Sequence, residues 1–135
     1  MISAITNRGQ LQFMVFKHKF NADVFKDFLS RLVRQSEDKV YLIVDRHPVH
    51  LSVQVKNWLN VHREKIHMYF LPGYSPELNP DELLNQDIKS NALGRKRARN
   101  QKDLMSKTRS FLRSRQRKPA SVKKYFHGVH VNYAA

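Results

Sequence analysis

The sequence contains no cysteine, which excludes disulfides and zinc sites built on thiolates. No apolar run approaches the length of a transmembrane helix, and the first residues lack the basic region and long apolar core of a signal peptide. We therefore expect a cytoplasmic protein with no membrane partner. A chain of 135 residues, 41% hydrophobic and 27% charged, is long enough for one globular domain with a modest core.

Acidic residues are scarce, above all in the C-terminal part. The chain has 25 Lys and Arg against 11 Asp and Glu, a net charge of +14. Residues 1–82 carry 11 basic and 9 acidic residues, a net charge of +2, whereas residues 83–135 carry 14 and 2, a net charge of +12. Such one-sided charge predicts a polyanion partner whose phosphates contact the basic side chains. The alternative is a basic surface that is only solvated and binds no partner. The predicted nucleic-acid-binding residues are Arg95, Lys96, Arg97, Arg99, Arg113, Arg115, Arg117 and Lys118.

The pattern of apolar residues and turn residues predicts the elements of an α/β chain. A hairpin is expected around the turn Asn7-Arg8-Gly9-Gln10, and a helix capped by Asn21 should bury one apolar face. Residues 129–133 alternate and predict a small strand or a docked tail. The full prediction is a hairpin over 2–6 and 11–16, strands over 39–44 and 66–71, and helices over 21–35, 51–62, 80–93, 101–117 and 121–126.

An aspartate directly follows the first of these buried strands. Val40 to Val44 is a continuous apolar run, typical of a strand buried on both faces of a parallel sheet, and Asp45 stands at its carboxyl end, where open α/β sheets bind ligands. A carboxylate in that position is costly to bury unless it is paired or bound to metal. The alternative is an Asp that only caps the next turn. His47 and His50 are a weak zinc signal, because no third ligand is evident.

Two further acids stand at a predicted helix start after the second strand. Asn79 is a suitable N-cap, Pro80 suits the first helical position, and Glu82 is third. The stretch from Leu71 thus presents Asp81 and Glu82 at the positive end of a helix dipole. Glu82 also fits a capping box, in which its carboxylate returns to the N-cap N–H, and Asp81 is the alternative metal ligand.

Together these two stretches resemble the catalytic core of the DDE transposases, the mariner-type enzymes and their bacterial insertion-sequence relatives. The family pattern is an apolar strand ending in Asp, a nearby His, and then Tyr-Ser-Pro-x-Leu-Asn-Pro-x-Glu. Here Val40–His50 matches the first part and Tyr74–Glu82 the second, with 36 residues between Asp45 and Glu82. The resemblance extends over most of the chain, from Ile2 to about Ala134.

The resemblance implies a ribonuclease-H-like mixed sheet with flanking helices. The hairpin would match the second and third strands of that fold. Its first, central strand, which carries the first catalytic Asp, would be absent, because no acid precedes Asp23. The chain is therefore expected to be an N-terminally truncated transposase catalytic domain. Residues 1–94 would be a partial catalytic core, and residues 95–135 a basic helical region of the same domain.

The implied activity is metal-dependent cleavage of DNA phosphodiesters and strand transfer in transposition. Asp45 and Glu82 would be catalytic residues and ligands of Mg²⁺ or Mn²⁺, with carboxylates within about 8 Å of each other in a two-ion site that is incomplete here. His50 would stand beside the site. The implied partners are transposon ends and target DNA, with a possible homodimer, in a nucleoid-associated protein. The fragment alone should be inactive. The alternatives are a non-catalytic DNA-binding remnant and a basic RNA-associated protein.

A missing central strand would leave two strand edges without partners. Unpaired buried backbone groups cost about 1–3 kcal/mol each, against a total stability of about 5–15 kcal/mol for a domain. We therefore expect one of three outcomes: the hairpin pairs directly with Val40–Val44, the tail Val129–Tyr133 inserts as a strand, or two chains associate edge to edge.

Overall fold

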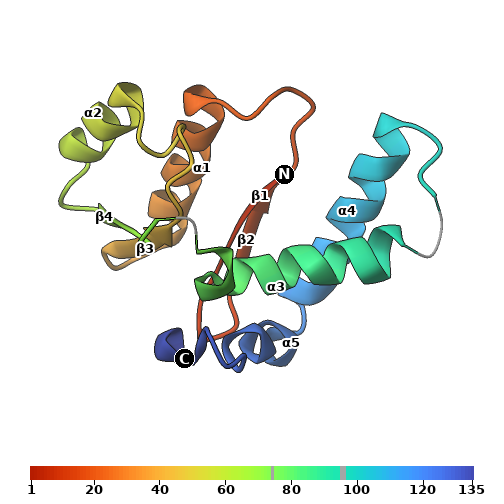
Figure 1. The fold of residues 1–135 in the computed structure, drawn as a ribbon. Helices are drawn as coiled ribbons and strands as arrows, with labels where there is room; N and C mark the ends of the chain where they lie inside the picture. Colours follow the sequence, from red (N-terminus) through yellow and green to blue (C-terminus); the bar gives the residue numbers. More distant parts are fainter. Residues whose placement is uncertain (74, 95–96) are drawn as a thin grey trace. The chain divides into compact units, whose positions relative to one another are not determined.

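The computed structural model describes residues 1–73, 75–94 and 97–135 (Figure 1). These residues form two compact units, one of residues 18–76 and the other of residues 1–17 and 77–135. Arg95 and Lys96, both predicted to bind nucleic acid, and Tyr74 of the Tyr-Ser-Pro motif lie outside the described residues. The predicted boundary at residue 94 stays a prediction.

The unit of residues 18–76 holds two helices and a parallel pair of strands. Its elements are α1 (Ala22–Gln35), β3 (Val40–Val44), α2 (Val53–Val61) and β4 (Ile66–Phe70). The predicted elements are thus confirmed, within two residues at each end. The predicted cap of α1 is also confirmed, because the Asn21 side chain accepts a hydrogen bond from the Val24 N–H. β3 and β4 pair in parallel, so their carboxyl ends lie at the same edge of the sheet.

The core of this unit lies on one face of its sheet. Alternate residues of a strand face opposite sides, and here the helices bury the side that includes Val44 and Ile66. On the other side, Tyr41 is 64% and Ile43 is 48% exposed. The prediction that β3 is buried on both faces is therefore wrong, because the two helices of the unit supply their apolar side chains to one face. The buried residues of these helices are Ala22, Phe25, Phe28, Leu29, Leu32 and Val55.

The other unit packs helices on the predicted hairpin. β1 (Ile2–Ile5) and β2 (Leu11–Met14) pair antiparallel, and Gly9 in their turn has a φ of 90°. α3 (Pro80–Asp87) contacts β1, and α4 (Gln101–Gln116) contacts β2. The predicted helix over 80–93 is α-helical only to Asp87. It continues as the π-helical segment η2 (Ile88–Leu93), where the turn is wider.

One apolar cluster holds this unit together. It joins the hairpin to α3, η2, α4, the short helix α5 (Pro119–Lys123) and the 3₁₀ turn η3 (Lys124–Phe126). The last two elements, α5 and η3, are found where a single helix over 121–126 was predicted. Gly9 lies against α5, because a Cβ there would come within 2.5 Å of the Pro119 carbonyl oxygen. The buried members of the cluster are Leu11, Leu84, Ile88, Leu112, Val122 and Tyr125.

The C-terminal tail docks without forming a strand. Val131 is only 2% exposed, and the Tyr133 hydroxyl donates to the Leu78 carbonyl at 2.5 Å. Local hydrogen bonds, from the Val131 N–H to Gly128 and from the Ala134 N–H to Val131, occupy backbone groups that a strand would need. The docked-tail alternative is therefore confirmed, and the predicted strand and its insertion into a sheet are wrong.

The strands of the described residues form two separate sheets of two strands each. The hairpin and β3 belong to different compact units, so direct pairing between them stays a prediction. Association of two chains through their edges stays a prediction. The mixture of helices and two small sheets confirms the α/β class. No helix in the described part of the chain is both long and apolar enough to cross a membrane.

Candidate active site

Asp45 directly follows β3, and its carboxylate is held by its own loop. Its Oδ1 accepts hydrogen bonds from the His47 backbone N–H at 3.0 Å and from the His50 ring nitrogen Nδ1 at 3.1 Å. Its Oδ2 accepts no hydrogen bond from any residue that the structure describes. With a side chain that is 52% exposed, Asp45 thus offers one anchored oxygen and one accessible oxygen.

His50 is the buried partner in this arrangement. Its side chain is only 12% exposed and its ring lies 4.5 Å from that of Phe25 and 6.0 Å from that of Phe20, measured between ring centroids. Burial lowers the pKa of His50, and it outweighs the hydrogen bonds and the charge of Asp45, which raise the pKa. The ring is therefore neutral at neutral pH. His50 therefore contacts Asp45, and the expectation that it stands beside a catalytic site stays a prediction.

The loop that carries these residues is fixed by bonds within the same unit. The Val49 N–H donates to Nδ1 of His47, and the His50 N–H donates to the His47 carbonyl. Arg46 joins the ends of the two parallel strands, because its Nε donates to the Leu71 carbonyl at 3.2 Å and its guanidinium lies over the Phe70 ring. These contacts hold the loop after β3 and the end of β4 together at the carboxyl edge of the sheet, next to Asp45.

Glu82 and Asp81 occupy the first turn of α3 and differ in their contacts. The side chain of Asn79 caps the helix by accepting from the Asp81 N–H at 3.1 Å. Asp81 Oδ1 accepts from the Ser3 hydroxyl at 2.7 Å, which ties this acid to β1. The partly buried Glu82 carboxylate takes part in no hydrogen bond or ion pair with the described residues, and so the capping box is not formed. These contacts favour Glu82 over Asp81 as the available ligand.

The donor set of these acids fits a hard cation. Carboxylate oxygens are the ligands that Mg²⁺ and Mn²⁺ prefer, and both Asp45 and Glu82 have oxygens without a protein partner among the described residues. Within residues 1–73, 75–94 and 97–135, no group of three or more His, Asp or Glu side chains gathers as a metal site would require. Asp45 and Glu82 lie in different compact units, so their predicted proximity stays a prediction.

The predicted nucleic-acid-binding residues that the structure describes fall into two groups. Arg115 is partly buried. It pairs with Asp87 at 3.1 Å, and its guanidinium lies 4.7 Å from the Phe111 ring centroid. The others are exposed on and beside α4: Arg97, Arg99, Arg113, Arg117 and Lys118. The contacts of Arg115 stabilise the fold, whereas the exposed basic side chains point to solvent and are accessible to a partner.

The network around Asp87 was not predicted from the sequence. The Tyr125 hydroxyl donates to Asp87 Oδ2 at 2.5 Å, and Asn91 Nδ2 donates to Oδ1 at 2.5 Å, in addition to the ion pair with Arg115. Burial and the hydrogen bond to Asp87 raise the pKa of Tyr125 well above its ordinary value. The sequence gives one hint of this network. Asp87 is one of only two acidic residues in residues 83–135, and an acid among so many basic residues is expected to pair with one of them.

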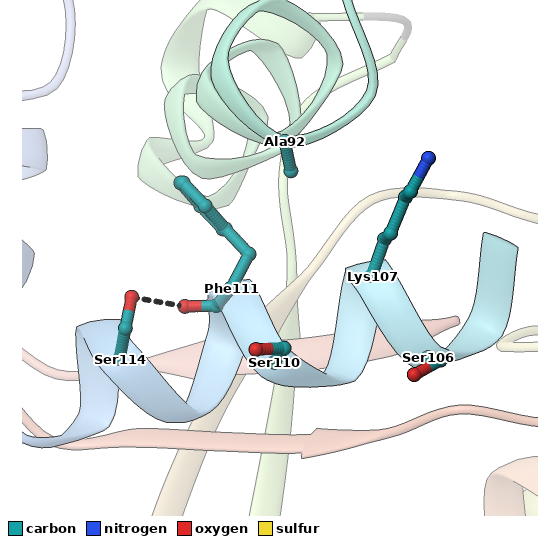
Figure 2. Close-up of a pocket in the computed structure, with 6 residues that line it drawn as sticks. All are labelled: Ala92, Ser106, Lys107, Ser110, Phe111 and Ser114. Atoms are coloured by element: carbon teal, nitrogen blue, oxygen red, sulfur yellow. Dashed lines mark hydrogen bonds between the residues drawn. The ribbon is translucent and has the colours of Figure 1, made fainter. Parts of the chain in front are cut away.

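A pocket of about 440 Å³ lies between η2 and α4. Figure 2 shows the serines of α4 following one another along the helix below Ala92 of η2, with the Ser114 hydroxyl turned back to the Phe111 carbonyl. The lining has no carboxylate, so this pocket is not a candidate for the metal site. Its residues are Ala92, Ser106, Lys107, Ser110, Phe111 and Ser114.

Comparison with known proteins identifies the family of the chain. No curated protein and no solved structure matches the chain. The model of the family described as DDE superfamily endonuclease matches residues 1–105, a range that includes the hairpin, Asp45 with its loop, and Glu82. Because this match extends over more than half of the sequence, the chain belongs to the DDE superfamily endonucleases.

Proposed function

We propose that the chain is part of a transposase catalytic domain in which Asp45 and Glu82 are metal ligands for cleavage of DNA phosphodiesters. The observation that carries this proposal is the Asp45 carboxylate at the carboxyl end of a parallel strand, with Oδ1 anchored and Oδ2 accessible. The family match supports the reaction class. The ribonuclease-H-like arrangement of the two sheets is part of the same proposal.

The residues of this chain have distinct tasks in the proposal. Asp45 and Glu82 would hold Mg²⁺ or Mn²⁺, which when bound supplies charge stabilisation at the attacking and leaving oxygens of the phosphodiester. Asp81 secures the first turn of α3 to β1 through Ser3. The exposed basic side chains of α4 and its flanks contact DNA phosphates and fix the duplex without reading its sequence.

Two carboxylates are fewer than this chemistry ordinarily uses. With two acids, one ion would be held weakly, so we propose that the 135-residue chain by itself binds metal and DNA but does not cleave. The test is Mn²⁺ binding, measured by electron paramagnetic resonance, for the wild type and the variants Asp45→Ala, Glu82→Ala and Asp81→Ala. Binding should be lost in the first two and kept in the third. Asp27→Ala, which removes an exposed acid paired with Arg31, is the matched control.

Two results would overturn parts of this proposal. Loss of Mn²⁺ binding in Asp81→Ala but not in Glu82→Ala would transfer the ligand role to Asp81. Cleavage of DNA by the wild-type chain with Mg²⁺ or Mn²⁺, abolished in Asp45→Ala, would show that another acid completes the site. Competition between duplex DNA and structured RNA tests the partner, because preferential binding of RNA would favour the RNA-associated alternative.

A further inference from the structure

The ring of His50 fixes which oxygen of Asp45 is available. Its Nδ1 lies 3.1 Å from Asp45 Oδ1 and 3.1 Å from the Asp45 carbonyl oxygen. Both of these partners can only accept hydrogen bonds, so Nδ1 must carry the hydrogen. The same Oδ1 also accepts from the His47 backbone N–H. Two donors therefore converge on one carboxylate oxygen and leave the other without a partner among the described residues.

The surroundings of His50 hold the ring in that position. The side chain is 12% exposed, and the ring is packed against Phe25 and Phe20, both of the same unit. Phe25 is itself only 1% exposed, so the surface against which the ring packs belongs to the core. Reorienting the imidazole would break the bonds to Asp45 and disturb this packing. The contact thus has the rigidity that a positioning residue needs.

We propose that His50 is a positioning residue that orients Asp45 for metal binding through a single oxygen, Oδ2. This inference rests on the proposed role of Asp45. Side chains that hydrogen-bond to a metal ligand orient it and tune its strength, and their loss typically lowers metal affinity about 10- to 100-fold. His50 acts through Asp45 and does not itself coordinate the ion.

The geometry of the imidazole provides a matched pair of variants. The amide nitrogen of Asn stands near the place of Nδ1, whereas that of Gln reaches the place of Nε2. His50→Asn should therefore keep a donor for Asp45 Oδ1 and bind Mn²⁺ within about threefold of the wild type. His50→Gln should lose the donor and bind about 10- to 100-fold more weakly. Amide NMR spectra and thermal melting without metal confirm that both variants are folded.

A second measurement requires no metal. Long-range ¹H–¹⁵N NMR of the imidazole rings should show His50 with its hydrogen on Nδ1 in the wild type, and Asp45→Ala should change that signal. Finding the hydrogen on Nε2, or equal Mn²⁺ affinities for His50→Asn and His50→Gln, would overturn the inference. If the wild type shows no Asp45-dependent Mn²⁺ binding, the proposed function fails as well. If Mn²⁺ binding depends on Asp45 but is the same in His50→Gln as in the wild type, the inference alone fails.

Discussion

The two compact units differ in charge and in the way each presents an acid. Residues 18–76 carry 9 basic and 6 acidic residues, whereas residues 1–17 and 77–135 carry 16 and 5. In the first unit, Asp45 is anchored by donors from its own loop, His47 and His50. In the second, Glu82 stands in the first turn of a helix, without a partner among the described residues.

In the function we propose, this difference separates two tasks, the orientation of a metal ligand and the attraction of DNA. The nearly balanced unit holds a carboxylate in a set orientation, which requires local rigidity more than charge. In the function we propose, the strongly basic unit attracts DNA, a task that requires many exposed cations more than a set geometry.

The largest expected effect concerns the basic unit. Replacing Arg97, Arg99, Arg113, Arg117 and Lys118 together by Ala should weaken DNA binding on the order of 100-fold or more at low salt. The slope of log affinity against log salt should fall by about 4.5 if each of the five side chains contacts one phosphate, because each lost contact removes about 0.9. Fluorescence anisotropy with duplex DNA at several salt concentrations measures both quantities.

A control of equal charge sharpens this result. Lys19, Arg34, Lys56, Arg63 and Lys65 are exposed residues of the other unit, and replacing all five by Ala removes the same charge. If DNA contact is confined to the basic unit, this variant should keep a slope close to that of the wild type. Equal slopes for the two variants would show that the net charge of the chain matters and its distribution does not.

The next largest effect compares one glycine in each unit. Gly9 and Gly73 both have positive φ, at 90° and 50°, but a Cβ on Gly9 would lie 2.5 Å from the Pro119 carbonyl oxygen, whereas a Cβ on Gly73 meets nothing within 4 Å. Gly9→Ala should therefore cost about 3 kcal/mol through strain and overpacking, and Gly73→Ala only about 1 kcal/mol. Denaturant unfolding gives both values, and equal costs would contradict the packing of the hairpin turn on α5.

A smaller effect is expected from the network around Asp87. Tyr125→Phe removes a hydrogen bond to a carboxylate that is largely shielded from water, and it should cost about 2 kcal/mol. Tyr41→Phe is the control in the other unit, where the side chain is 64% exposed and a cost near zero is expected. Thermal unfolding compares the two variants, and equal melting temperatures would show that the Tyr125 hydroxyl contributes nothing.

The elements that the sequence predicted correctly depend on neighbours in the chain. Asn21 caps α1 by reaching an N–H three residues ahead, and Asp45 follows five apolar residues, so both features are encoded locally. The placement of His50 beside Asp45 came from the family resemblance, and the contact spans only five residues. Local encoding also explains why the hairpin turn at Asn7-Arg8-Gly9-Gln10 was evident from the sequence.

The features that were missed depend on distant parts of the chain. The Ser3 hydroxyl donates to Asp81, 78 residues away in the sequence, and the Tyr125 hydroxyl donates to Asp87, 38 residues away. No local sequence pattern predicts either hydrogen bond. The alternating pattern of Val129–Tyr133 fits either a strand or a docked tail. In the structure Val131 is buried within its own unit, and the backbone after it forms a 3₁₀ turn. Strand neighbours are also set at long range, so the local pattern left three outcomes open for the unpaired strand edges.

The smallest expected effect is a pH dependence confined to the start of α4 in the basic unit. The Arg99 backbone N–H donates to Asp103, and this bond, with the nearby Lys107, lowers the pKa of Asp103 below its ordinary value. A lowered pKa in the folded state means that the ionised carboxylate stabilises the fold above its ordinary pKa of about 4 and loses this effect as the pH falls through the lowered value. Asp103→Asn should therefore melt slightly below the wild type at about pH 7, and this gap should be smaller at about pH 3, below the ordinary pKa of the carboxyl group. Asp23→Asn, which removes an exposed acid from the first turn of α1, is the matched control in the other unit. A gap for Asp103→Asn that does not change between the two pH values would show that the Arg99 bond is not formed in solution.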